Sequence, residues 1–205
     1  MTARDGKRKD GSLSREHFML RELRIVASLR FDGVPDDEIV RCAVDDNIFQ
    51  YPTTREAARV ARTMLLRLES LNDERLVGLA ARGPKERSAQ INLYAMMRVY
   101  PLMAAFMNEE IALRFRTLDY SITRADINGF LTRYQADHAE AAPWSESTVR
   151  RIGGVLVETL YEAGYVPAPR SEELLPFVID SYLEDAIYRN GDQQWLPAFN
   201  VMEVL

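Results

Sequence analysis

Apolar residues recur along this chain at intervals of three and four, which places them on one face of an α-helix. The segments with this spacing are residues 14–33, 35–47, 53–71, 72–83, 84–100, 101–118, 121–139, 145–163 and 171–191. No stretch of four to eight residues alternates apolar and polar side chains as a half-buried strand does. The pattern therefore predicts an all-α fold, a compact globule of many helices.

Residues that begin and end helices mark the limits of several segments. Pro35 precedes three acids, and Thr53 stands three residues before Glu56, the spacing of a capping box. Ser145 is expected to cap a helix that Gly164 stops. The residues that follow, "YVPAP", leave open one short β-strand, which would form the wing of a helix-turn-helix unit.

The chain is expected to have three parts. Residues 1–12 are predicted to be a disordered basic N-terminus. Residues 13–83 are predicted to form an N-terminal helical unit like a helix-turn-helix. Residues 84–205 are predicted to form a C-terminal helical unit, with a second such element at 121–166 and an apolar tail that docks. We expect the two units to pack as one globule.

Composition narrows the class of protein. The chain of 205 residues is 47% hydrophobic and 28% charged, as soluble globular proteins are. Its longest apolar run, "VYPLMAAFM", is far shorter than the roughly 20 residues that a membrane span needs. Cys42 is the only cysteine, which excludes an intrachain disulfide and a cysteine zinc cluster. We expect a cytoplasmic monomer with no membrane contact.

Charge is unevenly distributed along the chain. The net charge of −5 counts against nucleic-acid binding. Residues 1–100, however, carry 18 basic and 15 acidic side chains, whereas residues 101–205 carry 8 and 16. Lys7, Arg8 and Lys9 add a basic cluster near the N-terminus. A basic face can therefore coexist with an acidic C-terminal end.

The first candidate site is the helix predicted at 53–71. Arg55, Arg59 and Arg62 are spaced to form a stripe opposite its apolar side. With the short helix 35–46 before it, this segment follows the helix-turn-helix pattern. The guanidinium group can pair with phosphate or guanine through two parallel hydrogen bonds. The alternative is a solvated polar face on a core helix.

The second candidate site repeats this arrangement at 124–163. Ser147, Thr148, Arg150 and Arg151 crowd the first turns of the helix that Ser145 caps, where recognition helices contact DNA. Gly153 and Gly154 follow inside the helix, where glycine costs about 1 kcal/mol relative to alanine. Close approach of another backbone explains such glycines, and for Gly153 a helix crossing is the preferred explanation.

Residues typical of catalytic sites do not assemble in the sequence. There is no phosphate-binding glycine loop, and His17 and His138 each stand alone. The acidic pairs, such as Glu109–Glu110, lie in expected first turns or on charged faces. We therefore expect a protein that is not an enzyme and that needs no cofactor or metal.

The stretch "PWSESTVRRIGGVLVETLYEAGYV" at 143–166 resembles the BrxA family of the BREX bacteriophage-exclusion systems. The helices before it, including "INLYAMMRVYPLMAAFM", resemble that family as well. The resemblance covers about residues 15–190. It implies an all-α fold with helix-turn-helix elements and binding of double-stranded DNA without catalysis. The implied partners are an adenine methyltransferase, an ATPase and a phosphatase-like protein. The alternative function is an adaptor that docks a partner through the acidic C-terminal helix.

The sequence also ranks the candidate residues. We expect contact mainly with the DNA backbone and weak sequence preference, because neither predicted face offers a well-placed Asn or Gln for adenine. Arg55, Arg59 and Arg62 form the cleaner stripe. They are therefore expected to matter more than Arg150 and Arg151, which share their helix with Glu158 and Glu162.

Overall fold

The structure is a computed structural model, and it describes residues 10–201. Within this range it contains α-helices and short 3₁₀ and π turns but no β-strand, which confirms the all-α prediction. An isolated bridge pairs Ser121 with Glu173. The residues after Gly164 form turns and bends, so the short β-strand considered for "YVPAP" is not present. No helix in the described range is both long and apolar enough to cross a bilayer.

The chain divides into two compact units. Unit 1 consists of residues 19–99, and unit 2 consists of residues 10–18 together with residues 100–201. This division lies elsewhere than the boundary expected at residue 83. The helix after that position, α5 (Lys85–Val99), packs against α1 (Leu20–Phe31), α3 (Thr54–Ser70) and α4 (Glu74–Arg82), and so remains with the N-terminal helices.

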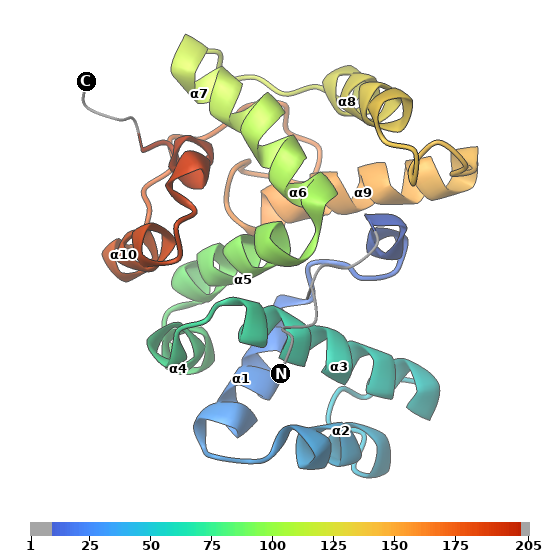
Figure 1. The fold of residues 1–205 in the computed structure, drawn as a ribbon, viewed down its shortest axis with the longest axis vertical. Coiled ribbons are helices and arrows are strands. Elements are labelled where there is room, and N and C mark those ends of the chain that lie inside the picture. Colours follow the sequence, from blue (N-terminus) through green and yellow to red (C-terminus); the bar gives the residue numbers. More distant parts are fainter. Residues whose placement is uncertain (1–9, 202–205) are drawn as a thin grey trace. The chain divides into compact units, whose positions relative to one another are not determined.

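In unit 1, helix α1 packs against each of the other four helices. Most side chains of α5 are buried, including Ile91, Tyr94 and Met96. The most extensive packing in the unit is between α1 and α4, and α2 (Asp36–Asp45) packs against α3 near the C-terminal end of α1 (Figure 1). The buried Arg67 of α3 donates a hydrogen bond to Asn92 Oδ1 of α5 over 3.3 Å, which joins the two helices inside the bundle.

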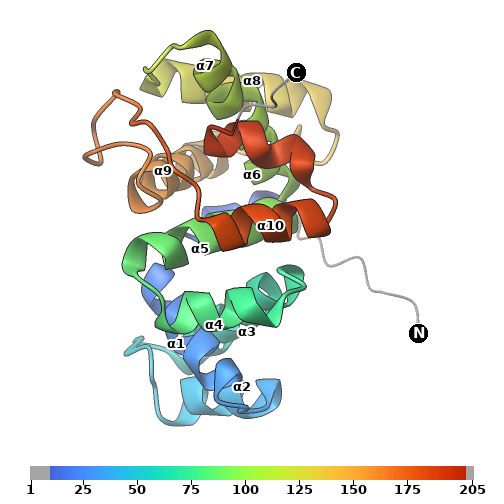
Figure 2. The same ribbon diagram turned by 90° about the vertical axis from the view of Figure 1, so that its left-hand side faces the viewer.

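Unit 2 surrounds one long irregular helix. Helix α6 (Pro101–Phe106) continues through a π turn, η2 (Met107–Ile111), into α7 (Ala112–Thr117) (Figure 1). Helices α8 (Arg124–Asp137) and α9 (Glu146–Glu162) form an adjacent pair. Helix α10 (Ser181–Arg189) leads into the 3₁₀ turn η3 (Gln193–Phe199), which packs on α7, as Figure 2 shows from the side. The apolar tail therefore docks as expected, as far as residue 201.

Residues 10–18 complete unit 2 although 81 residues of unit 1 separate them from Tyr100. The 3₁₀ turn η1 (Asp10–Ser14) packs on α9. The Asp10 carboxylate accepts hydrogen bonds from the Leu102 N–H (2.9 Å) and the Tyr134 hydroxyl (2.6 Å). The Tyr100 hydroxyl donates to Glu16 over 2.6 Å. Buried carboxylates thus attach this segment to the unit.

Two helix boundaries differ from the sequence prediction. The first helix begins at Leu20 rather than Ser14, because Met19 adopts the left-handed conformation (φ 49°) and the preceding residues belong to unit 2. The last helix begins at Ser181 rather than Ser171. Residues 171–180 instead run over the unit without helical structure, and the Leu174 N–H donates to the Tyr120 carbonyl over 3.0 Å.

Candidate nucleic-acid interface

Local capping residues set the start of the first candidate helix, α3. The Thr53 hydroxyl accepts a hydrogen bond from the Glu56 N–H over 3.3 Å, as the sequence predicted. The turn that joins α2 to α3 spans residues 46–53, which is longer than the three or four residues of a helix-turn-helix. The pair therefore resembles that motif only in its order of elements.

The arginine stripe of α3 is only partly available. Arg55 and Arg62 are exposed and have no hydrogen bond or ion pair within the described residues. Arg59 is half-buried and forms an ion pair with Glu56 at 3.5 Å. It also lies near Tyr51, whose pKa burial raises to about 12. Two of the three expected arginines thus point to solvent, while the central one is engaged inside unit 1.

The second candidate pair, α8 and α9, begins each helix with a strong cap. Thr123 and Asp126 form a complete capping box at the start of α8. Ser145 Oγ accepts from the Thr148 N–H over 3.3 Å, and it lies 2.9 Å from Ser147 Oγ. The hydroxyls of the predicted site are therefore gathered at the first turn of α9. Backbone N–H groups and the helix dipole make this end favourable for an anion.

The turn between α8 and α9, residues 138–145, is held from both sides. The Gln135 amide donates to the Ala141 and Trp144 carbonyls over 3.2 and 3.4 Å. Trp144 lies against Gly11, where a Cβ would come within 3.3 Å of its Nε1. This turn is also longer than that of a helix-turn-helix, but its contacts fix the start of α9 relative to α8.

An open groove of about 460 Å³ lies between α8 and the first turns of α9. Arg124 and Asn128 line it from α8, and Glu146, Val149 and Arg150 line it from α9. Neither Arg124 nor Asn128 was among the site residues expected from the sequence. Arg124 follows the Thr123 cap by one residue, but only the packing of α8 on α9 brings it near Arg150. Asn128 also supplies an exposed amide beside α9, which the sequence pattern did not indicate.

Three arginines of α8 and α9 have no hydrogen bond or ion pair within the described residues. Elsewhere in unit 2 the Arg114 guanidinium binds Glu110 (2.6 Å) and Asp126 (3.1 Å), and Arg133 also binds Glu110. Within the described residues, the basic side chains with neither hydrogen bond nor ion pair are Arg55, Arg62, Lys85, Arg116, Arg124, Arg150, Arg151 and Arg170. We call Arg124, Arg150 and Arg151 the α8–α9 arginines. They retain their full capacity to bind an anion.

One of the two acids expected to oppose these arginines is already paired. The Glu158 carboxylate lies 2.7 Å from His17 Nδ1, so it is directed at the segment 10–18 of the same unit. Glu162, near the end of α9, is half-buried. Glu146 remains on the groove wall and is the acid that directly opposes binding there.

The remaining predicted residues have different outcomes. Gly153 faces α8, where an added Cβ would lie 3.3 Å from Leu131 Cδ1, so a helix crossing explains this glycine. Gly154 has no atom within 4 Å of such a Cβ and lies on the open face. Lys7, Arg8 and Lys9 lie outside the described residues. The described residues contain no group of three or more His, Cys, Asp or Glu side chains arranged to hold a metal ion.

The chain is similar in sequence to one protein family. The family model described as BrxA matches residues 10–191. A BREX protein BrxA of Bacillus cereus (strain H3081.97) is 32% identical over 145 residues, which is 71% of this chain and 72% of that protein. A BREX protein BrxA of Escherichia coli O9:H4 (strain HS) is 28% identical over 89% of this chain and 85% of its own length.

The fold also recurs in a solved structure. The crystal structure of an uncharacterized protein from Magnetospirillum magneticum has a TM-score of 0.78 with this chain. The match covers 94% of this chain and 98% of that one, with 19% sequence identity. At this identity the likeness concerns the fold alone.

Proposed function

The chain belongs to the BrxA family and is thereby a component of a BREX phage-defence system, and from this premise we propose that it binds double-stranded DNA without catalysing a reaction. Binding is directed mainly at the phosphate backbone and has weak sequence preference. The α8–α9 arginines form the principal contact, and the exposed Arg55 and Arg62 of α3 supply a second one. The other proteins of the system are its protein partners in the cytoplasm.

The single observation that carries this proposal is the set of unpartnered α8–α9 arginines. Elsewhere in the same unit, Arg114 and Arg133 bind the carboxylate of Glu110. Arg124 and Arg150 instead face a shared groove beside a capped helix start. Guanidinium groups and helix N-termini both bind phosphate oxygens. A duplex backbone laid along this groove would receive both contacts.

Titration of a random-sequence duplex at several salt concentrations tests the proposal. With about five phosphates engaged, the logarithm of the binding constant falls against the logarithm of the salt concentration with a slope near −4 to −5. Several unrelated duplexes are expected to bind with similar affinity. A slope near zero, or strong preference for one duplex, would contradict backbone-directed binding.

Two multiple substitutions locate the interface. The change Arg124, Arg150, Arg151→Ala is expected to weaken binding about tenfold for each guanidinium–phosphate pair removed, and to flatten the slope by about one unit per pair. The change Arg55, Arg59, Arg62→Ala is the matched comparison. The sequence ranked this second set higher, whereas the paired Arg59 and the free groove arginines favour the first. A larger reduction with the α3 set would move the interface to unit 1.

An opposite charge change provides an internal control. Glu146→Gln removes the carboxylate from the groove wall and is expected to raise duplex affinity severalfold. Glu74→Gln, at an exposed position in the first turn of α4, is the matched control. Equal effects of the two changes would indicate that only net charge matters and that the groove is not the binding site.

A protein-interaction adaptor is the second candidate function. Helix α10 exposes Tyr182 and Tyr188 at 49% and 53%, and Val178 before it is 82% exposed. Exposed aromatic side chains are typical of protein interfaces. The double change Tyr182, Tyr188→Ser is expected to abolish pull-down of a purified BREX partner while leaving duplex binding intact. Undiminished pull-down would remove α10 from consideration.

A further inference from the structure

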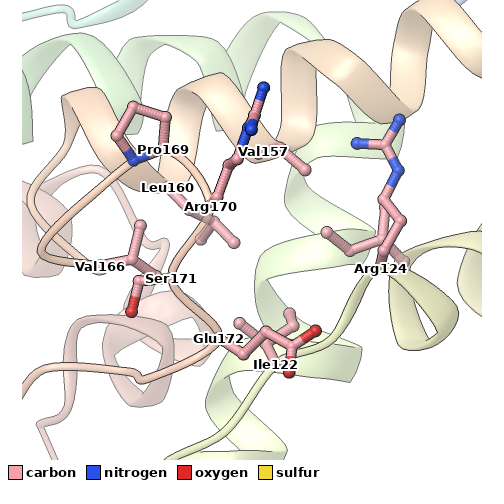
Figure 3. A pocket seen from close by; sticks show the side chains of 10 residues that line it. Ile122, Arg124, Val157, Leu160, Val166, Pro169, Arg170, Ser171 and Glu172 are labelled. Atoms are coloured by element: carbon pink, nitrogen blue, oxygen red, sulfur yellow. The ribbon is translucent and has the colours of Figure 1, made fainter.

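A second cavity of unit 2 has a different chemical character from the groove. It measures about 250 Å³ and lies between the start of α8, the second half of α9 and the loop 165–172 (Figure 3). We call it the loop pocket. Its apolar lining consists of Ile122, Ile127, Val157, Leu160, Val166 and Pro169. Such a lining favours an apolar group, which water solvates poorly.

The walls of the loop pocket are fixed by backbone hydrogen bonds. The Ile122 N–H donates to the Glu172 carbonyl over 2.8 Å, and the Ser171 N–H donates to the Ala168 carbonyl over 3.0 Å. Tyr165 anchors the loop beneath: its ring stacks on Phe177 at 4.3 Å, and its hydroxyl donates to the Ala198 carbonyl over 2.9 Å. The pocket is therefore formed before any ligand arrives, which lowers the entropic cost of binding.

The rim of the loop pocket is positively charged. Arg124 and Arg170 both line it, and neither has a hydrogen bond or ion pair within the described residues. Figure 3 shows Arg170 rising beside Val157 and Arg124 across the opening from it. Glu172 lies next to Ile122 and is the acid of the lining. Two guanidinium groups against one carboxylate leave an excess positive charge above an apolar floor.

We propose that the loop pocket binds a segment of a protein partner that presents one large apolar side chain next to a carboxylate. The apolar floor beside two arginines favours this occupant, and the small volume agrees with it, since small-molecule sites usually span about 300–1,000 Å³. A cavity of about 250 Å³ instead suits a single anchoring side chain, as at the centre of many protein interfaces. The flanking carboxylate pairs with Arg170 and Arg124.

Duplex DNA fits this pocket poorly. A duplex offers phosphates to the arginines, but its apolar base faces are stacked and its groove edges are polar. The loop pocket is therefore a protein-binding site adjacent to the proposed DNA groove. Arg124 lines both sites, whereas Arg170 lines only the loop pocket. Partner binding and DNA binding can accordingly be tested separately through Arg170.

The test uses the full chain with labelled Ile, Leu and Val methyl groups and NMR detection. The probe is the peptide acetyl-Ala-Phe-Glu-Ala-amide, with versions in which Phe is replaced by Ala or Glu by Gln. The first peptide is expected to shift the methyl signals of Ile122, Ile127 and Val157 with a roughly millimolar dissociation constant. Each altered peptide is expected to bind at least tenfold more weakly.

Three variants of the chain complete the test. Val157→Phe fills the cavity and is expected to abolish the shifts, and Arg170→Glu is expected to weaken binding at least tenfold. Glu172→Gln is expected to strengthen it severalfold. Arg116→Glu, at an exposed arginine of α7, is the matched control and leaves binding unchanged. Unaltered methyl dispersion in each variant verifies folding.

Several results would overturn the proposal. One is the absence of methyl shifts with any peptide, and another is equal binding of the Glu and Gln peptides. Equal effects of Arg170→Glu and Arg116→Glu would also overturn it. Binding of free N-acetylphenylalanine but not of the peptide would indicate a small-molecule site. A duplex that shifts the same methyl groups, in place of the peptide, would assign the pocket to DNA.

Discussion

Gly153 and Gly154 are neighbours in α9 but have opposite surroundings. A Cβ on Gly153 would lie 3.3 Å from Leu131 Cδ1, whereas a Cβ on Gly154 would meet no atom within 4 Å. Gly154 lies three and four residues after Arg151 and Arg150, so the three share one face of α9. A phosphate backbone bound by the two arginines would therefore pass close to Gly154. The absence of a side chain at Gly154 therefore leaves room for a phosphate backbone to approach α9.

Gly154→Ala should separate stability from binding. The helix gains about 1 kcal/mol from the better helix former, which raises the midpoint of thermal unfolding by about 2–4 °C. The added methyl group is expected to reduce duplex affinity severalfold because it holds the backbone away from α9. Gly153→Val is the contrasting change and should lower the thermal midpoint by crowding Leu131. Unchanged affinity of the Gly154 variant would place the DNA elsewhere.

Asp10 and Asp126 are two carboxylates of unit 2 with opposite dependence on pH. Burial raises the pKa of Asp10 above its ordinary 3.8, while hydrogen bonds from Leu102 and Tyr134 oppose that rise. The hydrogen bond from the Thr123 N–H lowers the pKa of Asp126, and the Thr123 hydroxyl and Arg114 add to the effect. The free energy of unfolding must therefore depend on these groups with opposite sign.

The sign follows from proton uptake. Folded Asp10 keeps its proton to higher pH than unfolded Asp10, so its contribution to stability falls as the pH rises through its raised pKa. Asp126 contributes stability that is present above the ordinary pKa and is lost as the pH falls through the lowered one. Relative to the parent, Asp10→Asn should therefore gain stability as the pH increases, and Asp126→Asn should lose it. Thermal midpoints from about pH 3 to pH 7 measure both; parallel curves would contradict the assignment.

Helix α9 is the element on which the proposed function depends. Its cap, Ser145, accepts a hydrogen bond from the Thr148 N–H, and the positive end of the helix dipole lies at the groove that Glu146 and Val149 line. The same end carries the hydroxyls of Ser147 and Thr148. A change at the cap can therefore alter the charge at the helix start without loss of the helix itself.

Ser145→Asp and Ser145→Asn make this comparison. Both residues cap helices about as well as serine, so both variants should keep the thermal midpoint of the parent. The aspartate places a carboxylate where a phosphate would bind, and duplex affinity should fall about tenfold relative to the asparagine variant. Ser145→Ala, which removes the cap, should cost about 1 kcal/mol of stability. Equal duplex affinity of the Asp and Asn variants would exclude the α9 start from the interface.

From residue 10 onward the chain begins in unit 2, passes through unit 1 and returns to unit 2. Residues 10–18 belong to unit 2, while the next 81 residues fold as unit 1. Leu13 and Phe18 are fully buried within this arrangement. Both tryptophans of the chain, Trp144 and Trp195, lie in unit 2. Their fluorescence therefore reports on the unit that the N-terminal segment completes.

Leu13→Ala tests whether that segment stabilises unit 2. The cavity should cost about 2–5 kcal/mol and lower the denaturant midpoint seen by tryptophan fluorescence. Leu13→Met, which conserves volume, should cost less than about 1.5 kcal/mol. Identical midpoints for the alanine variant and the parent would show that residues 10–18 contribute little to unit 2.

Local patterns in the sequence were sufficient to predict the helices and most of their limits. The threefold and fourfold spacing of apolar residues predicted the all-α class, and local capping chemistry set the starts of α3, α8 and α9. Both are properties of residues within one or two turns of each other. Family membership could also be inferred from the sequence, because a family comparison matches residues position by position along the chain.

Which side chains meet depends instead on the packing of distant segments. The helical spacing of apolar residues extends back to Ser14, yet the helix begins at Leu20 because the preceding residues pack in unit 2. Arg59 belongs to a regular stripe, yet it is half-buried in unit 1 while Arg55 and Arg62 of the same stripe are exposed. Arg124 lies 26 residues before Arg150 and joins it only because α8 packs against α9. Such contacts arise from helix packing in three dimensions, which no local spacing of residues encodes.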